Sequence, residues 1–227
     1  MKFLLNAVFS QNMKVKLVSL TNAIIEGKQL TPEELIVYTA RVSNPSNQMN
    51  FETSDKLVSY LVKNKHWSPF EMVDMTVEIT TSRGIAQQIL RHRSFSFQEF
   101  SQRYSKVNTI EPVNLRYKGE TNRQSSSDSL SDEDSEYFTQ KMNEIFELSQ
   151  NVYNEMLEKN VAKECARFIL PISTETTLYM KGSVRSWIHY LQIRCDNHTQ
   201  LEHRNIAQSI LQIFKLNFPN IIKSIEI

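Results

Sequence analysis

Residues 73–79 have the alternating pattern of a strand in a sheet with one buried and one solvent-exposed face. The apolar positions are Val73, Met75, Val77 and Ile79, and each is separated from the next by one polar residue. This period of two predicts a strand, and residues 14–20 form a second predicted strand. An apolar run over residues 1–9 is too short to span a membrane and lacks a small-residue cleavage pattern. It is predicted to be a strand or a terminal packing segment.

Helices are predicted in the first half of the chain by capping residues and by the spacing of apolar residues. The predicted segments are residues 31–41, residues 54–63, and a helix that follows Thr81 or Ser82. The first begins with a capping box, in which Thr31 is the cap and Glu34 lies three residues later. In the third, Gln88 and Arg91 are three residues apart and share a face, so an Arg-His-Arg triplet is predicted at its end.

The second half of the chain is predicted to be mostly helical. The segments are a long amphipathic helix over residues 132–160, a short piece carrying Arg167 toward Pro171, a helix from near Ser183, and a last helix after the capping box Thr199-Gln200-Leu201-Glu202. Arg185 and His189 are four residues apart, on a face of the helix from near Ser183 that lies next to its apolar stripe. Arg194 is nine residues from Arg185, about half a turn out of phase, so the two arginines should point to opposite sides.

Two segments lack periodic apolar residues and are predicted to be loops. Residues 94–105 are predicted to be a loop of the kind that presents binding residues. Residues 118–136 are polar and serine-rich and become acidic toward their end, which predicts a mobile loop or local insertion. No internal repeat or domain boundary is evident, so residues 1–227 are predicted to form a single domain with one polar variable loop.

Composition places the chain among ordinary soluble globular proteins, with 40% hydrophobic and 22% charged residues in 227. The net charge of +1 lacks the broad electrostatic footprint of a general nucleic-acid binder, so any anion site must be local. Two cysteines in a chain without a secretory leader are more often reduced and buried than bridged. We therefore expect a cytoplasmic protein that is not membrane-bound.

One short stretch, residues 91–105, has the composition of a polyanion site. It holds Arg91, Arg93 and Arg103, and arginine binds phosphate oxygens two at a time through a planar fork of donors. Glu99 would orient an arginine or accept a hydrogen bond from a sugar hydroxyl or a base. The alternative is a solvated basic loop with aromatics docked on the core, which is what most short charge clusters are.

The spacing of these residues resembles the signature of the flavin-dependent thymidylate synthases: Arg-His-Arg, then seven residues, then Ser101. The resemblance continues in His66-Trp67-Ser68-Pro69-Phe70-Glu71 upstream, and in Arg167-Phe168-Ile169-Leu170-Pro171 and residues 182–194 downstream. It covers most of residues 60–215. It implies an α+β fold, an antiparallel sheet covered by helices, and a homotetramer with sites shared between subunits.

The family makes dTMP by reductive methylation of dUMP, with methylenetetrahydrofolate as carbon donor, NADPH as reductant and FAD as hydride carrier. The resemblance implies nucleotide contacts at Gln88, Arg91, Glu99, Ser101, Arg103, Arg167 and Arg194. It also implies that Arg194 is catalytic, because a guanidinium against the uracil can stabilise negative charge on the ring. Without the resemblance, a helix-end arginine interacting with the helix dipole would be the simpler interpretation of Arg194.

The resemblance implies flavin contacts at Ser68, Arg91, His92, Arg93, Ser183, Arg185 and His189. Many relatives carry asparagine at the positions of Ser183 and His189, so the hydrogen bonds there must differ. Met72 likewise stands where relatives often have histidine, which puts a flavin contact there in doubt. His66 is expected near the flavin ring, although a histidine beside a tryptophan is otherwise more often a packed core residue.

Other chemistries are less consistent with the sequence. His198 and His203 lack a zinc-binding framework, so no metal site is predicted, and no Walker or Rossmann glycine motif is present. Arg194 could activate Cys195 as a thiolate, but Cys195 also completes an apolar helical stripe, and packing is the favoured role.

The competing hypothesis is a non-enzymatic protein that binds single-stranded nucleic acid by stacking bases on Phe95, Phe97, Phe100 and Tyr104. The near-zero net charge and the second set of arginines near the carboxyl terminus argue against it. A yellow purified protein would favour the flavoenzyme, and salt-dependent oligonucleotide binding would favour the alternative.

Overall fold

The computed structural model describes residues 14–105, 109–120 and 126–226. Contacts within the chain divide it into two compact units. Unit 1 contains Thr80–Gln88 and the described part of Glu99–Thr177, and unit 2 contains Lys14–Ile79, Ile89–Gln98 and the described part of Leu178–Ile227. The apolar segment predicted at residues 1–9 lies outside the described residues. The single-domain assignment stays a prediction.

A four-stranded sheet has the order β1-β4-β8-β5. Some residues of β4 and of β8 are assigned to unit 1 and the others to unit 2. The strands are β1 (Lys14–Leu20), β4 (Asp74–Ser82), β8 (Glu175–Ser183) and β5 (Ser96–Glu99). Both strands predicted from the sequence are confirmed, and the second extends to Ser82.

Side-chain pairs show that β1 and β4 run antiparallel. Lys16 forms a 2.8 Å ion pair with Glu78, whereas the backbone N–H of Thr21 donates to the carbonyl of Asp74 at 3.0 Å. Residue numbers thus rise along one strand as they fall along the other. The expected antiparallel sheet is confirmed.

The same test applies to β4 and β8 and identifies the polar face of the sheet. The hydroxyl of Tyr179 donates to Glu78 at 3.0 Å, and Lys181 pairs with Asp74 at 2.8 Å. These pairs again run in opposite directions. They also place charged side chains on one face, which confirms the exposed face that the alternation of residues 73–79 predicts.

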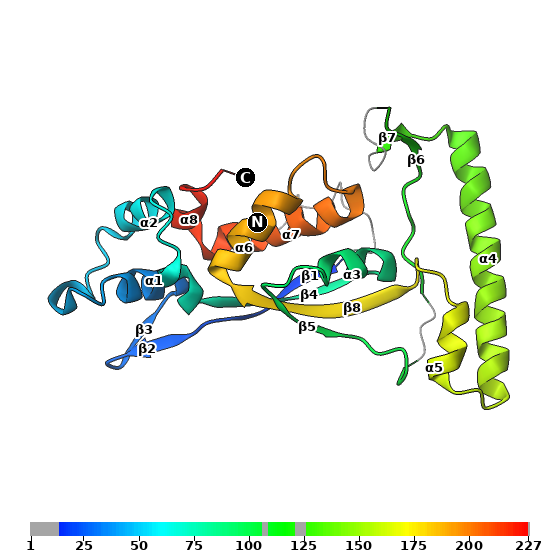
Figure 1. Ribbon diagram of the computed structural model, residues 1–227, viewed down its shortest axis with the longest axis horizontal. Helices are drawn as coiled ribbons and strands as arrows, with labels where there is room; N and C mark the ends of the chain where they lie inside the picture. Colours follow the sequence, from blue (N-terminus) through cyan, green and yellow to red (C-terminus); the bar gives the residue numbers. More distant parts are fainter. Residues whose placement is uncertain (1–13, 106–108, 121–125, 227) are drawn as a thin grey trace, which may run out of the picture. The chain divides into compact units, whose positions relative to one another are not determined.

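The opposite face of the sheet is the core of unit 2. Its fully buried side chains include Met75, Val77, Ile79, Leu178 and Met180. Two helices cover it and lie side by side in Figure 1: α6 (Val184–Arg194) and α7 (Leu201–Asn217). The buried indole of Trp187 donates to the carbonyl of Met75 at 2.9 Å, which ties α6 to β4.

The remaining elements of unit 2 are short. They are the hairpin β2 (Ala23–Ile25) and β3 (Lys28–Leu30), α1 (Pro32–Ala40), η1 (Pro45–Asn47), α2 (Ser54–Lys63), η2 (Ser68–Met72) and α8 (Pro219–Ile222). The predicted capping box of α1 is confirmed, with reciprocal bonds between Thr31 and Glu34. The hairpin turns at Gly27, whose φ of 79° lies in the left-handed region that glycine adopts without strain.

Unit 1 is dominated by one long helix. Its elements are α3 (Arg83–Ile89), which begins in this unit, the hairpin β6 (Arg116–Lys118) and β7 (Ser126–Ser129), α4 (Asp132–Glu158), α5 (Lys163–Ala166) and η3 (Arg167–Ile169). The predicted long helix is confirmed. Ser131 caps it by accepting from the backbone N–H of Asp134, and Figure 1 shows α5 alongside it. The hydroxyl of Ser149 donates to the carbonyl of Ile169 at 2.6 Å.

The loop predicted over residues 94–105 is wrong in part, because Ser96–Glu99 form β5 at the edge of the sheet. Phe95 and Phe97 do alternate with serines, but two aromatic positions are too few to distinguish a strand from a loop. The strand forms because β8 lies next to it and offers backbone hydrogen-bonding groups. Just after β5, the N–H of Phe100 donates to the carbonyl of Thr177 at 2.8 Å.

The polar loop predicted over residues 118–136 is also wrong in part. Residues 126–129 are a strand and α4 already begins at Asp132, while residues 121–125 lie outside the described residues. All four residues of β7 are exposed, so no apolar alternation marks the strand. Backbone pairing with β6 forms it instead, and Arg116 adds a 2.8 Å hydrogen bond to Ser126.

The predicted capping box at Thr199 is wrong. The N-cap of α7 is Gln200, which makes no side-chain capping bond. The hydroxyl of Thr199 donates instead to the carbonyl of Ile193 at 3.0 Å and so completes the end of α6. A hydroxyl between two helices can serve either one, and the sequence does not show which.

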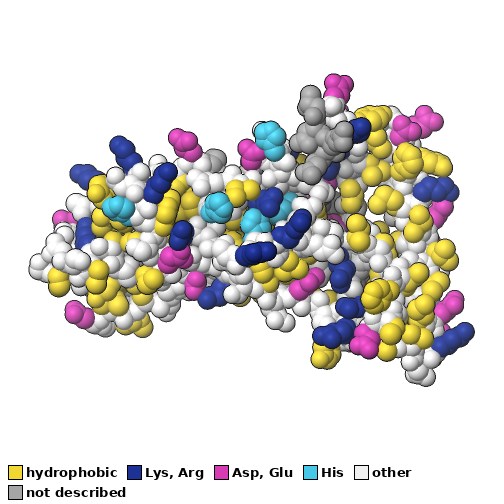
Figure 2. Space-filling view, viewed as in Figure 1, with side chains coloured by type: hydrophobic (Ala, Val, Ile, Leu, Met, Phe, Trp, Pro, Cys, Tyr) yellow, Lys and Arg dark blue, Asp and Glu magenta, His cyan; other side chains and the backbone are white. Residues whose placement is uncertain are grey.

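One face of α4 carries exposed apolar side chains at three- and four-residue spacing: Tyr137, Phe138, Met142, Ile145 and Leu148. Figure 2 shows yellow side chains over the surface where Figure 1 draws α4. In the described part of the chain, no helix has the length and apolarity needed to cross a membrane.

Candidate functional site

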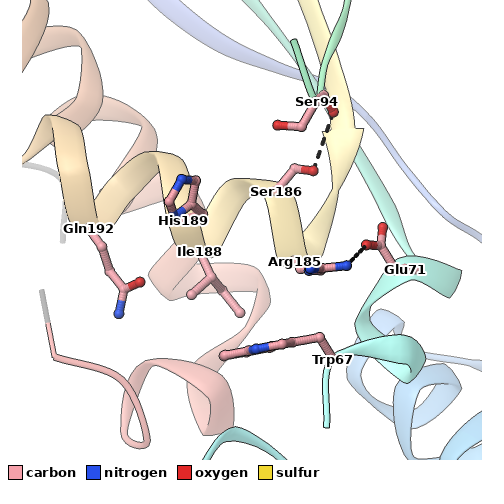
Figure 3. Close-up of a pocket in the computed structure, with 8 residues that line it drawn as sticks. All are labelled: Trp67, Glu71, Ser94, Arg185, Ser186, Ile188, His189 and Gln192. Atoms are coloured by element: carbon pink, nitrogen blue, oxygen red, sulfur yellow. Dashed lines mark hydrogen bonds and ion pairs between the residues drawn. The ribbon is translucent and has the colours of Figure 1, made fainter. Parts of the chain in front are cut away.

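A cavity of about 430 Å³ in unit 2 lies against one face of α6 (Figure 3). Arg185, His189 and Gln192, at spacings of four and three residues, line it from the helix. The predicted shared face of Arg185 and His189 is therefore confirmed. Trp67 and Glu71 line it from the segment around η2, and Glu71 forms a 2.8 Å ion pair with Arg185.

Serine hydroxyls hold the start of α6 beside this cavity. Ser183 is the N-cap and accepts from the backbone N–H of Ser186 at 3.3 Å. The hydroxyl of Ser186 donates to the carbonyl of Ser94, also at 3.3 Å, which joins α6 to the segment after the Arg-His-Arg triplet. Ser183 is buried and occupied by capping. Its contact with a flavin stays a prediction.

The other end of α6 holds a cluster of rings beneath Arg194. The Nε of Arg194 donates to Nε2 of His92 at 2.9 Å. The ring of His92 meets the buried ring of Tyr190 edge to face, with centroids 4.9 Å apart. The hydroxyl of Tyr190 shares a 3.0 Å hydrogen bond with Nε2 of His203, a fully buried side chain of α7. Arg185 and Arg194 thus have separate partners, in agreement with their predicted opposite directions.

Burial governs protonation in this cluster. It lowers the pKa of His92 to about 4, with smaller contributions from the charges of Arg194 and His189. It lowers the pKa of His203 to about 3, again with a contribution from Arg194. Both imidazoles are therefore neutral at pH 7. Burial likewise raises the pKa of the Tyr190 hydroxyl well above its usual range.

Cys195 follows Arg194 but is not an activated thiol. Burial raises its pKa to about 11, which leaves very little thiolate at neutral pH. The favoured packing role is consistent with this protonation state. Cys165, the other cysteine, is exposed and free.

The arginines of the Arg-His-Arg triplet face solvent. Arg91, Arg93 and also Arg103 are exposed, and within residues 14–105, 109–120 and 126–226 their guanidinium groups have no hydrogen-bond or ion-pair partner. Arg185 and Arg83, by contrast, are bonded to Glu71 and Gln102 at 2.8 Å. Unpartnered guanidinium groups are the form in which arginine can bind an anionic ligand.

In unit 1, buried contacts fix the loop after β5. Gln102 is 2% exposed, and its side-chain oxygen accepts from Arg83 of α3. The buried anchor lies between Ser101, which is partly exposed, and Arg103, which is exposed. Glu99 accepts a 3.0 Å hydrogen bond from Thr176 of β8. Arg167 lies 5.8 Å from the ring of Phe168.

The predicted site residues are divided between the two units. All residues expected to contact a flavin are in unit 2: Ser68, Arg91, His92, Arg93, Ser183, Arg185 and His189. Of the residues expected to contact a nucleotide, Arg91 and Arg194 are in unit 2, and Gln88, Glu99, Ser101, Arg103 and Arg167 are in unit 1. Arg185 and His189 line the cavity, whereas His66 is exposed with its ring centroid 5.7 Å from that of Tyr60.

Several residues of this region were not assigned a role from the sequence. Gln192 lies one turn after His189, so the helical spacing that joined Arg185 and His189 could have included it. Trp67 and Glu71 lie in the His66–Glu71 motif but had no assigned contact. The Tyr190–His203 pair joins two helices, and no spacing within either helix predicts it.

Phe95, one of the four aromatic residues of the nucleic-acid hypothesis, is not available for base stacking. Phe95 is 9% exposed and packs edge-on against Trp187 with ring centroids 4.7 Å apart. It belongs to the core of unit 2 and cannot take a base on its face, which counts against the nucleic-acid hypothesis. Among the residues that could be described, no group of three or more His, Cys, Asp or Glu side chains is placed to hold a metal ion.

The chain is similar to known proteins over almost its whole length. The family model described as thymidylate synthase complementing protein matches residues 27–220. The chain is 49% identical over 215 residues to a probable flavin-dependent thymidylate synthase of Paramecium bursaria Chlorella virus 1, covering 94% of this chain and 99% of that protein. It is 51% identical over 216 residues to a flavin-dependent thymidylate synthase of Synechocystis sp., covering 94% and 100%.

A solved structure has the same fold. It is a UMP/dUMP methylase, PolB, from Streptomyces cacaoi, bound with 5-Br dUMP. Its TM-score is 0.80 at 26% identity, and 94% of each chain is covered. On the strength of the family match and of identities near one half over nearly the full length, this chain belongs to the flavin-dependent thymidylate synthase family.

Proposed function

We propose that this protein methylates dUMP to dTMP, with methylenetetrahydrofolate as carbon donor, NADPH as reductant and FAD as bound cofactor. The observation that carries the proposal is that three arginine side chains have no bonding partner in the described protein. In the portion of the chain that the structure describes, Arg91, Arg93 and Arg103 have no protein partner, and dUMP and FAD both carry phosphate groups. The names of the relatives above support a flavin cofactor, and that of the solved structure, a UMP/dUMP methylase, supports dUMP as the substrate.

The residues of the cavity fit a flavin. A flat aromatic ring (Trp67), a guanidinium group (Arg185) and hydrogen-bonding side chains (His189 and Gln192) line a space of about 430 Å³. Such a set can contact the face of a planar heterocycle and bond to the polar atoms at its edge. When bound, FAD would supply hydride transfer, which no side chain of the chain can perform.

Arg194 is proposed to bind and activate the uracil. Its Nε is occupied by His92, whereas its two terminal nitrogen atoms have no partner among the described residues. Those donors are free to bond to a pyrimidine carbonyl. A fixed guanidinium can stabilise the negative charge that develops on the ring as C5 becomes nucleophilic.

The proposal needs no cysteine nucleophile. The raised pKa of Cys195 keeps this thiol protonated at neutral pH, and burial rather than a charged partner is the main cause. Deprotonating it would cost more than for an ordinary cysteine. The protonation state therefore supports a mechanism in which the protein orients and polarises the nucleotide without attacking it.

The residues proposed to contact the nucleotide are Gln88, Arg91, Glu99, Ser101, Arg103, Arg167 and Arg194. The buried Gln102–Arg83 bond supports this role for Ser101 and Arg103, because it anchors the loop between them. An anchored loop loses less conformational entropy on binding a phosphate.

A homotetramer with sites shared between subunits is part of the proposal. The exposed apolar face of α4 supports self-association, because its five apolar side chains are between 37% and 65% exposed in the single chain. A second copy of the chain would remove this surface from water.

The test is an anaerobic assay on the purified protein. The visible spectrum is recorded, NADPH is added with and without dUMP, and methylenetetrahydrofolate is then added and dTMP measured. We expect a yellow protein whose absorbance bleaches and which forms dTMP. Arg194→Ala should keep its flavin and lose most methylation. The control Arg41→Ala, whose guanidinium group is bonded to Asn47 and Thr53 and has no proposed ligand contact, should keep both. A colourless protein that neither takes up FAD nor forms dTMP would refute the proposal.

A further inference from the structure

The orientation of Arg194 depends on a single hydrogen bond to the protein. Its Nε–H donates to His92 Nε2 at 2.9 Å, and among residues 14–105, 109–120 and 126–226 the structure gives its guanidinium group no other partner. The guanidinium plane of an arginine turns easily about its last bonds when nothing holds it. The bond to His92 is therefore what fixes the direction in which the two terminal nitrogen atoms point.

This bond requires one protonation state of His92. The Nε2 atom can accept only if it carries a lone pair, so the imidazole must be neutral with its proton on Nδ1. A protonated His92 would present a donor to the donor of Arg194 and a positive charge to a guanidinium group. The bond and the protonated imidazole are mutually exclusive.

The surroundings of His92 favour the neutral form from every side. The titratable or charged groups that face it are Arg194, His189 and Tyr190 on α6, and His203 on α7. None of these is an anion at neutral pH, and the pKa of His92 is lowered to about 4 by burial and by Arg194 and His189. Among the described residues, the groups that shift the pKa of His92 include no carboxylate that would favour a proton on the ring.

The position of the His92 ring is set by a second buried pair. Tyr190 meets His92 edge to face at 4.9 Å and has no exposed surface. Its hydroxyl is bonded to His203 at 3.0 Å, so the tyrosine is held from α7 and cannot retreat from His92. Successive contacts therefore connect Arg194, the proposed uracil contact, to the buried core. They run from Arg194 to His92, then to Tyr190 and then to His203.

We propose that His92, backed by the Tyr190–His203 pair, is a positioning residue that fixes the guanidinium group of Arg194 by accepting its Nε–H. The expected effect of His92 on catalysis rests on the proposed function. The hydrogen bond between His92 and Arg194 does not. A role for His92 as a flavin contact alone would not require a defined tautomer or a bond to Arg194.

The structural half is tested by NMR on the full-length protein labelled with ¹⁵N in histidine only. The chain has five histidines, and the His92→Gln variant identifies the resonances of His92 by their loss. We expect a neutral imidazole with an unprotonated Nε2 from about pH 8 to about pH 5. Arg194→Ala should move the Nε2 resonance, because it removes the donor. A proton on Nε2, or titration at an ordinary pH near 6.5, would overturn the proposal.

The functional half uses two substitutions that differ in one property. His92→Gln keeps an acceptor within reach of Arg194 and cannot titrate, whereas His92→Leu keeps comparable bulk and has no acceptor. We expect His92→Leu to lower kcat about tenfold or more at saturating FAD and dUMP, and His92→Gln to recover most of the loss. Equal losses in both variants, or losses that follow the FAD content, would refute positioning through the hydrogen bond.

The two proposals can fail separately. If the wild-type protein forms no dTMP but His92 shows an unprotonated Nε2 that responds to Arg194→Ala, the proposed function fails and the positioning contact stands. If the wild-type protein is active and His92 carries its proton on Nε2, the positioning role fails and the function stands.

Discussion

Gly182 of β8 lies so close to Phe95 that a Cβ at this position would be 2.5 Å from Cδ1 of the ring. Phe95 cannot move aside freely, because its ring packs edge-on against Trp187 at 4.7 Å and lies 5.9 Å from that of Tyr190. The close approach of β8 and the segment that begins β5 therefore depends on the absence of a side chain at residue 182.

Gly182→Ala should lower the free energy of unfolding by about 1–3 kcal/mol, because the added methyl group overpacks a closed aromatic cluster. Gly84→Ala is the matched control. At Gly84 the nearest atom to an added Cβ is Ile172 Cδ1 at 3.6 Å, an ordinary contact, and alanine in α3 should stabilise by about 0.5–1 kcal/mol. Urea denaturation of the three proteins measures both effects, and equal stabilities would contradict the packing argument.

The stability of the protein should fall on acidification below about pH 6.5. His92 and His203 have folded-state pKa values of about 4 and about 3, below the 6.5 of an ordinary histidine. Between these folded-state values and pH 6.5, the unfolded chain binds more protons than the folded chain. The free energy of unfolding therefore decreases as the pH falls, by up to about 1.4 kcal/mol per pH unit for each histidine. The stabilising contribution is fully present above about pH 6.5.

Urea denaturation at intervals from about pH 7.5 to about pH 4.5 measures this slope. His203→Asn removes one of the two groups and should reduce the slope, whatever its effect on stability at pH 7. The control His198→Asn replaces an exposed surface histidine and shows what the loss of a histidine that is not buried does to the slope. A free energy of unfolding that stays level across the range would contradict burial of neutral imidazoles.

A buried carboxylate joins α1 to α8. Glu33 Oε1 accepts from the backbone N–H groups of Asn220 and Ile221 at 2.8 and 3.0 Å, and Oε2 accepts from the Asn220 side chain at 2.9 Å. Glu33→Ala should lower the free energy of unfolding by about 2–4 kcal/mol at pH 7, since it leaves these donors unsatisfied. Glu33→Gln should cost less, because one oxygen can still accept.

The control for Glu33 is the neighbouring Glu34, which is less buried and whose carboxylate accepts from the N–H of Thr31 in the capping box. Glu34→Gln should cost at most about 0.5 kcal/mol, because glutamine can make the same capping bond. Thermal denaturation of the variants at pH 7 separates the two positions. Similar losses at Glu33 and Glu34 would show that the contact with α8 contributes little.

The parts of the fold that the sequence predicted are those determined by neighbouring residues. The alternation in residues 73–79 follows from one buried and one exposed face, and the start of α1 follows from Thr31, Pro32 and Glu34 within one turn. The strand β5 was missed because an edge strand is formed by hydrogen bonds to a distant partner, β8. The exposed strand β7 was missed because a strand without a buried side has no apolar period.

The same distinction holds for the candidate site. Arg185 and His189 share a face of one helix, so their spacing predicted their common position at the cavity. The Glu71–Arg185 pair joins residues 114 positions apart, and Tyr190–His203 joins two helices. Such pairs depend on how elements pack against one another, and spacing along the chain carries no information about that.

The exposed arginines should matter for ligands and not for folding. Arg93→Ala and Arg103→Ala should each change the free energy of unfolding by less than about 0.5 kcal/mol, because neither guanidinium group bonds to a described residue. Arg93→Ala should nevertheless lose FAD on gel filtration, and Arg103→Ala should raise KM for dUMP about tenfold or more. Arg83→Ala is the contrast: loss of its bond to the buried Gln102 should lower stability. Full FAD occupancy in Arg93→Ala would remove Arg93 from the flavin site.

The apolar face of α4 should be the surface through which copies of the chain associate. Ile145 and Leu148 are 64% and 65% exposed, and a charge placed there would be buried without a partner in any contact that covers them. Ile145→Glu/Leu148→Glu should therefore reduce the mass measured by analytical ultracentrifugation below that of the wild-type oligomer. Gln140→Glu/Asn143→Glu adds the same two charges to the opposite face of the same helix and should leave the mass unchanged. A monomeric wild-type protein would exclude α4 as a contact between copies. An unchanged mass in the first variant would also exclude it, because two charges buried in a contact should weaken that contact.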